Sequence, residues 1–127
     1  ACDRAGVGPE DIACIHAHGT GTRENDRIEG RAIRGFLNAT APRVPVVSIK
    51  GAMGHLLGAA GSVELAVVVR ACQARRSPGN ATLLQCDPEF AGLCLPRESI
   101  NLRPGAIVKL SLGFGGHLAA VVLQAVR

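Results

Sequence analysis

Two histidines stand in glycine-rich surroundings next to predicted strands. His18 opens the sequence His-Gly-Thr-Gly-Thr directly after the apolar run 12–17, and His55 lies between a predicted strand at 46–49 and an apolar helix. Strand ends and helix starts of α/β folds are where active sites gather. A single histidine is more often structural, but two in the same context, with Lys50 five residues before His55, favour catalysis.

Metal binding is an alternative role for these histidines. His16 and His18 are two residues apart on the predicted strand, so their side chains share one face of it. A zinc hydrolase would need a third ligand, and no carboxylate or cysteine lies at a convincing spacing. The glycine-rich segments also lack the patterns of phosphate-binding loops and dinucleotide sites. We therefore expect no metal and no cofactor, and metal analysis of the purified protein tests the zinc hypothesis.

The elements that would position the histidines alternate between strands and helices. This order predicts an α/β fold with a mixed, mostly parallel sheet, a buried helix and a terminal β-hairpin. The predicted segments are a helix end and turn at 1–11, strands at 12–17 and 46–49, a helix from Asn25 or Asp26 to Leu37, a glycine-rich loop at 50–61, a helix at 59–74, an irregular stretch at 75–105 with a short strand at 93–95, and strands at 107–112 and 118–126.

The two longer predicted helices differ in their surfaces. The first has one apolar face, formed by Ile28, Ala32, Ile33 and Phe36 or Leu37. Its other face carries four arginines, Arg23, Arg27, Arg31 and Arg34. The second helix is apolar on nearly every side from Val63 to Cys72. A helix of that kind must be covered on several sides, which indicates that this chain does not work alone.

The composition restricts the class of protein. The chain has 127 residues, 47% apolar and 19% charged, which is typical of one globular domain. A net charge of +4 with no Trp and no Tyr argues against a nucleic-acid partner. No uninterrupted apolar run approaches the ~18 residues of a membrane span. Five cysteines, an odd number without Cys-x-x-Cys spacing, favour free thiols in a reducing cytoplasm.

Three motifs stand in an order that matches a known family. They are Ala17-His18-Gly19-Thr20-Gly21-Thr22, Lys50-x-x-x-Gly54-His55-x-x-Gly58-Ala59-Ala60-Gly61-x-x-Glu64, and Gly113-Phe114-Gly115-Gly116. Together they resemble the C-terminal half of a β-ketoacyl synthase, the condensing enzyme of fatty-acid and polyketide synthesis. The resemblance implies a thiolase-like fold, a homo- or heterodimer, and an acyl carrier protein as partner, whose phosphopantetheine arm carries acyl and malonyl groups.

The resemblance also implies a role for each motif residue. In the family a cysteine holds an acyl group as a thioester, and two histidines, matched here by His18 and His55, assist decarboxylation of the malonyl group. Neutral imidazoles can hydrogen-bond the thioester carbonyl where enolate charge develops. The other matches are Lys50 and Glu64 as an ion pair that orients the neighbouring histidine, Thr20 and Thr22 as hydroxyls for the pantetheine arm, Phe114 as the gate, and Asp26 and Glu29 as structural acids.

The chain departs from the family pattern at several positions. The nucleophilic cysteine of the family lies in a motif resembling Thr-Ala-Cys-Ser-Ser, and none of the five cysteines here has that context. We therefore expect residues 1–127 to be a partial C-terminal ketosynthase domain without the N-terminal half that bears the nucleophile. The other departures are His117-Leu118 in place of Thr-Asn, Leu110 and Leu112 in place of Asn and Phe, and His16 in place of Glu or Asn.

Two functions compete on these observations. In the first, the chain supplies the two histidines and the lysine of a condensing site that a cysteine-bearing half completes. In the second, it is a non-catalytic ketosynthase-like scaffold or carrier-protein-binding module. Retention of His18, His55 and Lys50 argues for the enzyme, because a scaffold needs no buried polar groups, whereas His117-Leu118 argues for the scaffold. The arginine stripe is either a solvated helix face or a docking site for the acidic carrier protein.

Overall fold

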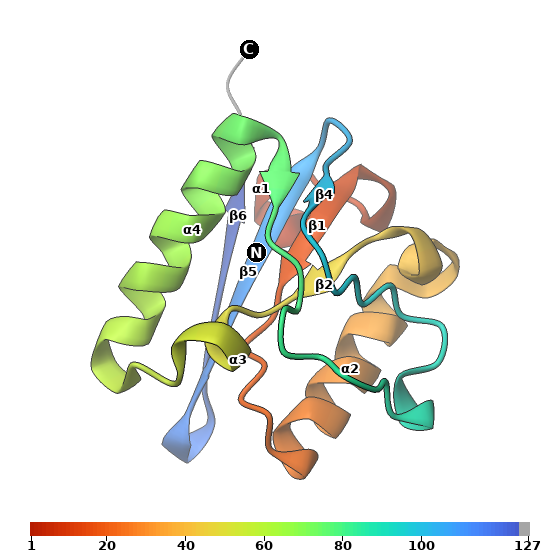
Figure 1. The fold of residues 1–127 in the computed structure, drawn as a ribbon. Coiled ribbons are helices and arrows are strands. Elements are labelled where there is room, and N and C mark those ends of the chain that lie inside the picture. The colour runs from red at the N-terminus through yellow and green to blue at the C-terminus, as the bar shows by residue number, and fades with distance from the viewer. Residues whose placement is uncertain (125–127) are drawn as a thin grey trace.

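A computed structural model describes residues 1–124. The chain alternates between strands and helices in the predicted order (Figure 1). Its elements are α1 (Cys2–Ala5), β1 (Ile12–His16), α2 (Arg23–Leu37), β2 (Val46–Val47), α3 (Lys50–Met53), α4 (Ala60–Ala74), β3 (Arg76–Ser77), β4 (Ile100–Asn101), β5 (Ala106–Gly113) and β6 (His117–Leu123).

The main sheet has the strand order β2-β1-β5-β6. Strand β1 pairs in parallel with both β2 and β5, and β5 and β6 form an antiparallel hairpin. The fold class is therefore confirmed: an α/β protein whose sheet is mostly parallel, with one antiparallel pair at the C-terminal end. Strand β1, one of the two inner strands, ends at His16, two residues before His18 begins the glycine-rich loop.

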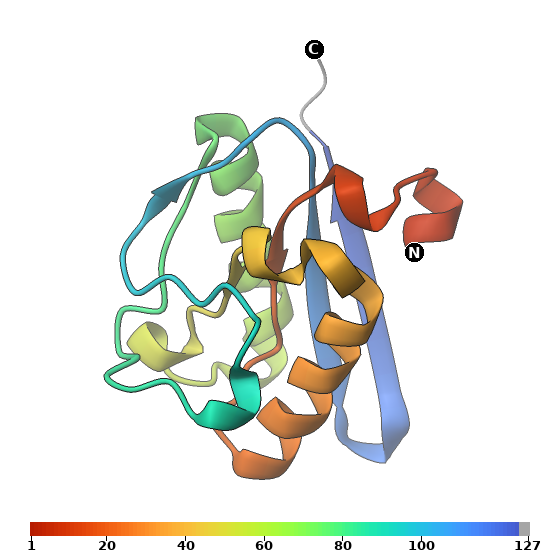
Figure 2. The ribbon, with the colours of Figure 1, turned by 90° about the vertical axis from the view of Figure 1, so that its right-hand side faces the viewer.

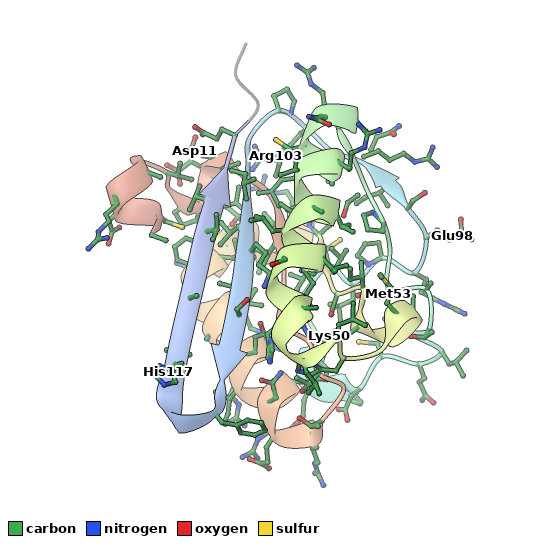
Figure 3. The ribbon with its side chains drawn as sticks, turned by 90° about the vertical axis from the view of Figure 1, so that its left-hand side faces the viewer. Asp11, Lys50, Met53, Glu98, Arg103 and His117 are labelled. Carbon is green, nitrogen blue, oxygen red and sulfur yellow. The ribbon has the colours of Figure 1, made fainter. Side chains whose placement is uncertain are left out.

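The sheet lies between two helices. Helix α2 covers one face (Figure 2), and helix α4 covers the other (Figure 3). The strands alternate accordingly. Ile15 of β1 and Val108 of β5 pack on the α2 side with Ile33, whereas Cys14 and Ile107 pack on the α4 side. The core is thus two apolar layers separated by the sheet.

Helix α2 begins earlier than predicted and buries a partly different face. It begins at Arg23, with Thr22 as its N-terminal cap residue, and its buried residues are Glu29, Gly30, Ile33 and Leu37. Of the predicted apolar face, Ile33 and Leu37 are buried, with Leu37 taking the position predicted for Phe36 or Leu37. The prediction was wrong at Ile28, which is 58% exposed, and at Ala32, which is also exposed. The helix turns toward the sheet because Glu29 binds backbone N–H groups of the His18 loop, and because Phe90 lies against Gly30, where a side chain would clash.

Helix α4 buries one face only within the described residues, so the cover that its apolar surface was predicted to need does not come from them. Its buried residues are Ala60, Glu64, Val68 and Ala71, at helical spacing along one side. Val69, on another side, is 37% exposed. The outer apolar surface of α4 is therefore open to solvent in this chain.

The stretch Leu57–Ala74 reaches the length and mean hydropathy of a membrane span, although only 22% of it is buried. The sequence prediction considered uninterrupted apolar runs, whereas this stretch contains Glu64 and Arg70 and begins with a short turn at Leu57. Because Glu64 forms ion pairs with two buried lysines, and Val68 packs against the sheet, we interpret α4 as a core helix.

Smaller differences lie in the loops. Residues 50–53, predicted as loop, form the short helix α3, and the predicted strand at 93–95 is a single bridge between Pro45 and Cys94. The irregular stretch contains the two-stranded sheet β3–β4, which was not predicted. Strand β6 ends at Leu123, and residues 125 and 126 of the predicted last strand lie outside the described residues.

Candidate active site

Strand alternation brings the polar residues of the site to the α4 side of the sheet. His16 and His18 follow Cys14 at intervals of two on and after β1, and Lys109 follows Ile107 on β5. His16 and Lys109 are register partners in the parallel pair. The polar residues therefore lie on the same sheet face as the apolar layer under α4, next to it and toward the carboxyl end of β1.

The loop after β1 is held by the first turns of α2. Glu29 accepts hydrogen bonds from the backbone N–H groups of His18, at 2.6 Å, and Gly19, at 2.9 Å, and Asp26 accepts one from Gly21. Gly19 has a φ of +52°, and a Cβ there would lie 2.6 Å from the Cβ of Ser48. The two acids thus hold the loop, in agreement with the structural role predicted for them, and a glycine is required at position 19.

Lys50, at the start of α3, connects the loop to α4. Its Nζ donates to the backbone carbonyl of His18 at 2.6 Å, lies 3.4 Å from Nδ1 of the same residue, and forms an ion pair with Oε1 of Glu64. Lys50 and Glu64 are 6% and 3% exposed. Figure 3 shows Lys50 beside the N-terminal turns of α4. The predicted pair is therefore present, and it is shielded from water.

The second oxygen of Glu64 contacts another lysine. Oε2 of Glu64 lies 2.8 Å from Nζ of Lys109, which is 3% exposed and also donates to Oγ of Ser111. Burial alone would raise the pKa of Glu64, but its contacts and charge interactions with Lys109 and Lys50 hold that pKa below its usual value. The carboxylate is therefore ionised between two ammonium groups.

The two histidine rings meet edge to face. The ring centroids of His18 and His55 are 5.7 Å apart and the ring planes are inclined by 84°. Nδ1 of His55 accepts a hydrogen bond from the backbone N–H of Leu57 at 3.0 Å. Nδ1 of His18 faces the Lys50 ammonium, which has only protons to offer. In neutral rings both protons then lie on Nε2, so each imidazole has a free N–H donor.

The environment of His18 disfavours its protonation. Burial lowers the pKa of His18 most, and the Lys50 charge lowers it further, while Glu64 opposes this effect. His55 and Lys109 add smaller repulsive contributions. The His18 imidazole is therefore neutral at pH 7.

His16 lies deeper and is more strongly affected. It is 2% exposed, and neither ring nitrogen has a hydrogen-bond partner among the described residues. Burial, with smaller repulsion from Lys109 and Lys50, lowers its pKa to about 4 in spite of the nearby Glu64 charge. Residues 1–124 contain no group of three or more His, Cys, Asp or Glu side chains that could hold a metal ion.

Burial makes two of the five cysteines, Cys14 and Cys94, poor nucleophiles. All five are free, and burial raises the pKa of Cys14 to about 11, the opposite of what thiolate formation requires. Burial also raises the pKa of Cys94.

The remaining predicted residues lie at the rim. Thr20 and Thr22 are hydrogen-bonded to each other through their hydroxyls at 2.8 Å. Phe114 is 101% exposed in the β5–β6 connection, so the described residues do not bring its ring into the buried cluster. A cavity of about 360 Å³ lies next to the loop and is lined by Thr20, Glu29, Ser48 and Lys50 among others, but not by His18 or His55.

The arginine stripe is only partly free. Arg23 and Arg31 are exposed, whereas Arg27 pairs with Glu24 at 3.6 Å and Arg34 donates to the backbone carbonyl of Glu89.

Sequence reasoning missed Lys109 and the anchoring residue Asn80. Lys109 could have been found from the alternation of β5, because it shares a strand face with the buried Ile107. Asn80 accepts from the backbone N–H of Ser48 and donates to the carbonyls of Val46 and Pro96. No local pattern distinguishes this asparagine, since its partners are distant in the sequence.

The mixed sheet lies between two helices, and two imidazoles lie beside a buried lysine–glutamate pair, the residues that the family resemblance singles out. The family described as "Beta-ketoacyl synthase, C-terminal domain" matches residues 1–83. The chain belongs to this family. It spans about 30% of the length of the curated relatives that it matches.

Relatives from two pathways resemble the chain at similar levels. It is 40% identical to the tetracenomycin polyketide synthase ketoacyl synthase alpha subunit of Streptomyces glaucescens, over 97% of this chain and 29% of the relative. It is 35% identical to 3-oxoacyl-[acyl-carrier-protein] synthase 2 of Coxiella burnetii, over 96% of this chain and 30% of the relative. The chain is thus a C-terminal ketosynthase domain of the polyketide and fatty-acid type.

Solved structures agree with this assignment. A ketosynthase of a type II polyketide synthase, solved in complex with its acyl-carrier protein and bound to the hexaketide, superposes with a TM-score of 0.92 at 28% identity. The superposition covers 99% of this chain and 31% of that one.

Proposed function

We propose that this chain forms one part of a decarboxylating β-ketoacyl synthase and contributes His18, His55 and Lys50 to its site. The observation that carries the proposal is the pair of imidazoles, 5.7 Å apart, each with Nδ1 engaged and Nε2 left as a donor. Two such donors on one carbonyl oxygen would stabilise the negative charge of an enolate.

The chemistry assigned to the site proceeds in two steps. The bond between the malonyl carboxylate and its α-carbon breaks, carbon dioxide leaves, and the electron pair becomes an enolate whose oxygen accepts from His18 and His55. The enolate carbon then attacks the acyl thioester carbonyl and expels the enzyme thiolate, which gives a β-ketoacyl thioester on the carrier. Neither step requires a net proton transfer from the imidazoles.

Lys50 and Glu64 support His18 in this proposal. Lys50 binds both the backbone carbonyl and the side chain of His18, which fixes the ring with Nε2 as donor. Glu64 compensates the buried ammonium, which would otherwise be very unfavourable in a site without water.

The site needs a second part that provides the nucleophile. Burial makes the pKa of Cys14 and Cys94 high, and both lie in the core or under loops rather than beside the imidazoles. Large apolar side chains are exposed around the site, namely Met53, Leu56, Leu57, Phe114 and Leu118. We assign this surface to the N-terminal, cysteine-bearing region of a ketosynthase, since the chain spans only about 30% of its curated relatives.

The partner in catalysis is an acyl carrier protein with a phosphopantetheine arm. The hydroxyls of Thr20 and Thr22 stand next to the loop and would bind the arm. Arg31 is the best probe of docking, because Arg27 and Arg34 already have internal partners. Charge reversal, Arg31→Glu, should weaken carrier binding at low salt and reduce its salt dependence; unchanged affinity at low salt would reject this role.

Reconstitution tests the proposal as a whole. The chain alone should show no condensation, and combination with a cysteine-bearing N-terminal ketosynthase region should produce decarboxylation of malonyl-carrier protein and then condensation. Full activity of the isolated chain would overturn the account. A reconstituted complex that forms but never decarboxylates the substrate would instead support the scaffold, the alternative that the His117-Leu118 sequence favours.

A further inference from the structure

The Glu64 carboxylate forms ion pairs with two lysines. Its Oε1 pairs with Lys50 and its Oε2 with Lys109, at 2.8 Å, and each of the three residues is no more than 6% exposed. The three side chains come from three different elements, α3, α4 and β5. The ion pair that the family motif describes is therefore one half of a longer Lys50–Glu64–Lys109 network.

Lys109 has few alternatives to this contact. It lies on the inner face of β5 between Ile107 and Ser111, opposite His16, whose ring has no hydrogen-bond partner among the described residues. Its ammonium reaches only Oγ of Ser111 and Oε2 of Glu64 among the described side chains. A buried ammonium is costly unless it is paired, so Glu64 determines where Lys109 points.

The contact restrains Glu64 in turn. A carboxylate in contact with a cation through one oxygen can rotate about its χ angles, whereas ion pairs on both oxygens restrain that rotation. The contact of Lys109 with Oε2 is such an ion pair and has no hydrogen-bond geometry. Oε1 then stays on Lys50, and Lys50 stays on the carbonyl and Nδ1 of His18. The order of the imidazole thus depends on a residue of β5 that does not touch it.

We propose that Lys109 is a positioning residue of the His18 site, which acts by holding the second oxygen of Glu64. The proposal rests on the proposed function for the role of His18, but the contact itself does not. The network holds two cations and one anion, so Lys109 also leaves an excess positive charge near the imidazole. The charged and titratable groups that act on His18 are Lys50 from α3, Glu64 from α4, Lys109 from β5 and His55 from the loop before α4, and His16 of β1 is acted on by the same three charges of Lys50, Glu64 and Lys109.

The test replaces Lys109 by methionine, which keeps the length and removes the charge. Lys50 and Glu64 remain as a balanced pair, so no buried charge is stranded. Lys109→Arg keeps a cation at the same place, and Arg70→Met, on the exposed side of α4, removes a positive charge without touching the network. All variants are prepared in the reconstituted ketosynthase, with only this chain labelled at the histidine Cε1 carbons for NMR.

We expect Lys109→Met to move the His18 titration to higher pH and to lower malonyl decarboxylation at pH 7 about tenfold, a smaller loss than the ~10²-fold that a 1 Å misplacement of the reacting groups can cause. The acid limb of the pH–rate profile should move with the titration. Lys109→Arg and Arg70→Met should leave both within about threefold of the starting protein. A folded Lys109→Met protein with unchanged titration and rate overturns the proposal, as does an equal loss in Lys109→Arg.

Two further outcomes are separable. If the starting protein does not decarboxylate at all, the proposed function fails, and the His18 titration still decides the role of Lys109. If Lys109→Met does not fold, the double variant Glu64→Gln/Lys109→Met is compared with Glu64→Gln. The proposal requires the double variant to be the more stable one, because it removes a stranded cation, and equal or lower stability overturns it.

Discussion

The buried Lys50–Glu64–Lys109 network and the exposed residues of the candidate site differ in burial and in what holds them. Lys50, Glu64 and Lys109 lie on helices and a strand, are almost completely buried and hold one another by charge. His55 and Phe114 lie in glycine-rich connections and are exposed, and Phe114 has no cover within the described residues. The charged groups of the network therefore find their partners within the described residues, whereas the exposed residues of the candidate site are not covered by them.

The largest effect on stability is expected from replacing Glu64, the only anion of the Lys50–Glu64–Lys109 network. Glu64→Gln leaves two buried ammonium groups without a counter-charge, and we expect a loss of about 3–5 kcal/mol in the free energy of unfolding. The measurement is urea denaturation of the reconstituted protein. Glu24→Gln removes an exposed ion pair with Arg27 and should cost at most about 1 kcal/mol. Equal losses in the two variants would show that the network contributes no more than a surface pair.

Substitution of His18 and of His55 should have similar effects on decarboxylation but different effects on stability. Removal of either donor should lower decarboxylation by about 10²–10³, as for the loss of one oxyanion-hole donor. Only His18→Ala should also lower the unfolding free energy, because His18 is 8% exposed and binds Lys50, whereas His55 lies at the surface. Paired rate and denaturation measurements check this, and a stability loss in His55→Ala as large as in His18→Ala would contradict it.

The buried region should also respond to acid. The pKa of His16 is lowered to about 4, from a reference value of 6.5, so between these values the unfolded chain binds a proton that the folded chain does not. The neutral His16 ring therefore contributes about 3 kcal/mol to the free energy of unfolding. This contribution is complete above pH 6.5 and is lost as the pH falls toward 4. The pKa of His18 is also lowered, so His18 likewise reduces the free energy of unfolding as the pH falls.

Denaturation midpoints at pH 7, 5.5 and 4.5 measure this effect. His16→Asn keeps a polar side chain that does not titrate, and the difference between the two pH profiles isolates His16 from His18. Parallel profiles would show that His16 takes up its proton as easily in the folded chain as in the unfolded one.

The smallest effect is expected at the tip of the hairpin. Phe114→Ala should change the unfolding free energy of the isolated chain by less than about 0.5 kcal/mol, because the ring buries nothing there. Condensation by the reconstituted protein should nevertheless fall if the ring serves as a gate. A clear loss of stability in the isolated chain would show that Phe114 belongs to the core.

The sequence predicted the family-matched part of the site but not its support. His18, His55, Lys50 and Glu64 were found because their spacing follows a motif, and the structure brings them together. Lys109 was missed because it belongs to no motif, and its partner becomes visible only when β5 is placed beside β1 under α4.

The fold was predictable to a similar degree. Alternation of strands and helices predicted the sheet and its hairpin, because periodicity is a local property. The buried face of α2 was partly wrong because Glu29 and Gly30 turn inward for tertiary reasons, one to bind the His18 loop and the other to admit the Phe90 ring. The apolar sequence of α4 predicted a helix that needs cover on several sides, and the described residues cover only one of them.

The position of β5 in the sheet also has a consequence for biosynthesis. The ribosome completes His18, Lys50 and Glu64 well before β5, which occupies Ala106–Gly113. Until that strand emerges, one edge of β1 has no partner, and open strand edges invite pairing with other chains. A nascent chain that stops ahead of residue 106 would thus hold His18, Lys50 and Glu64 on an unfinished sheet, a state that favours aggregation.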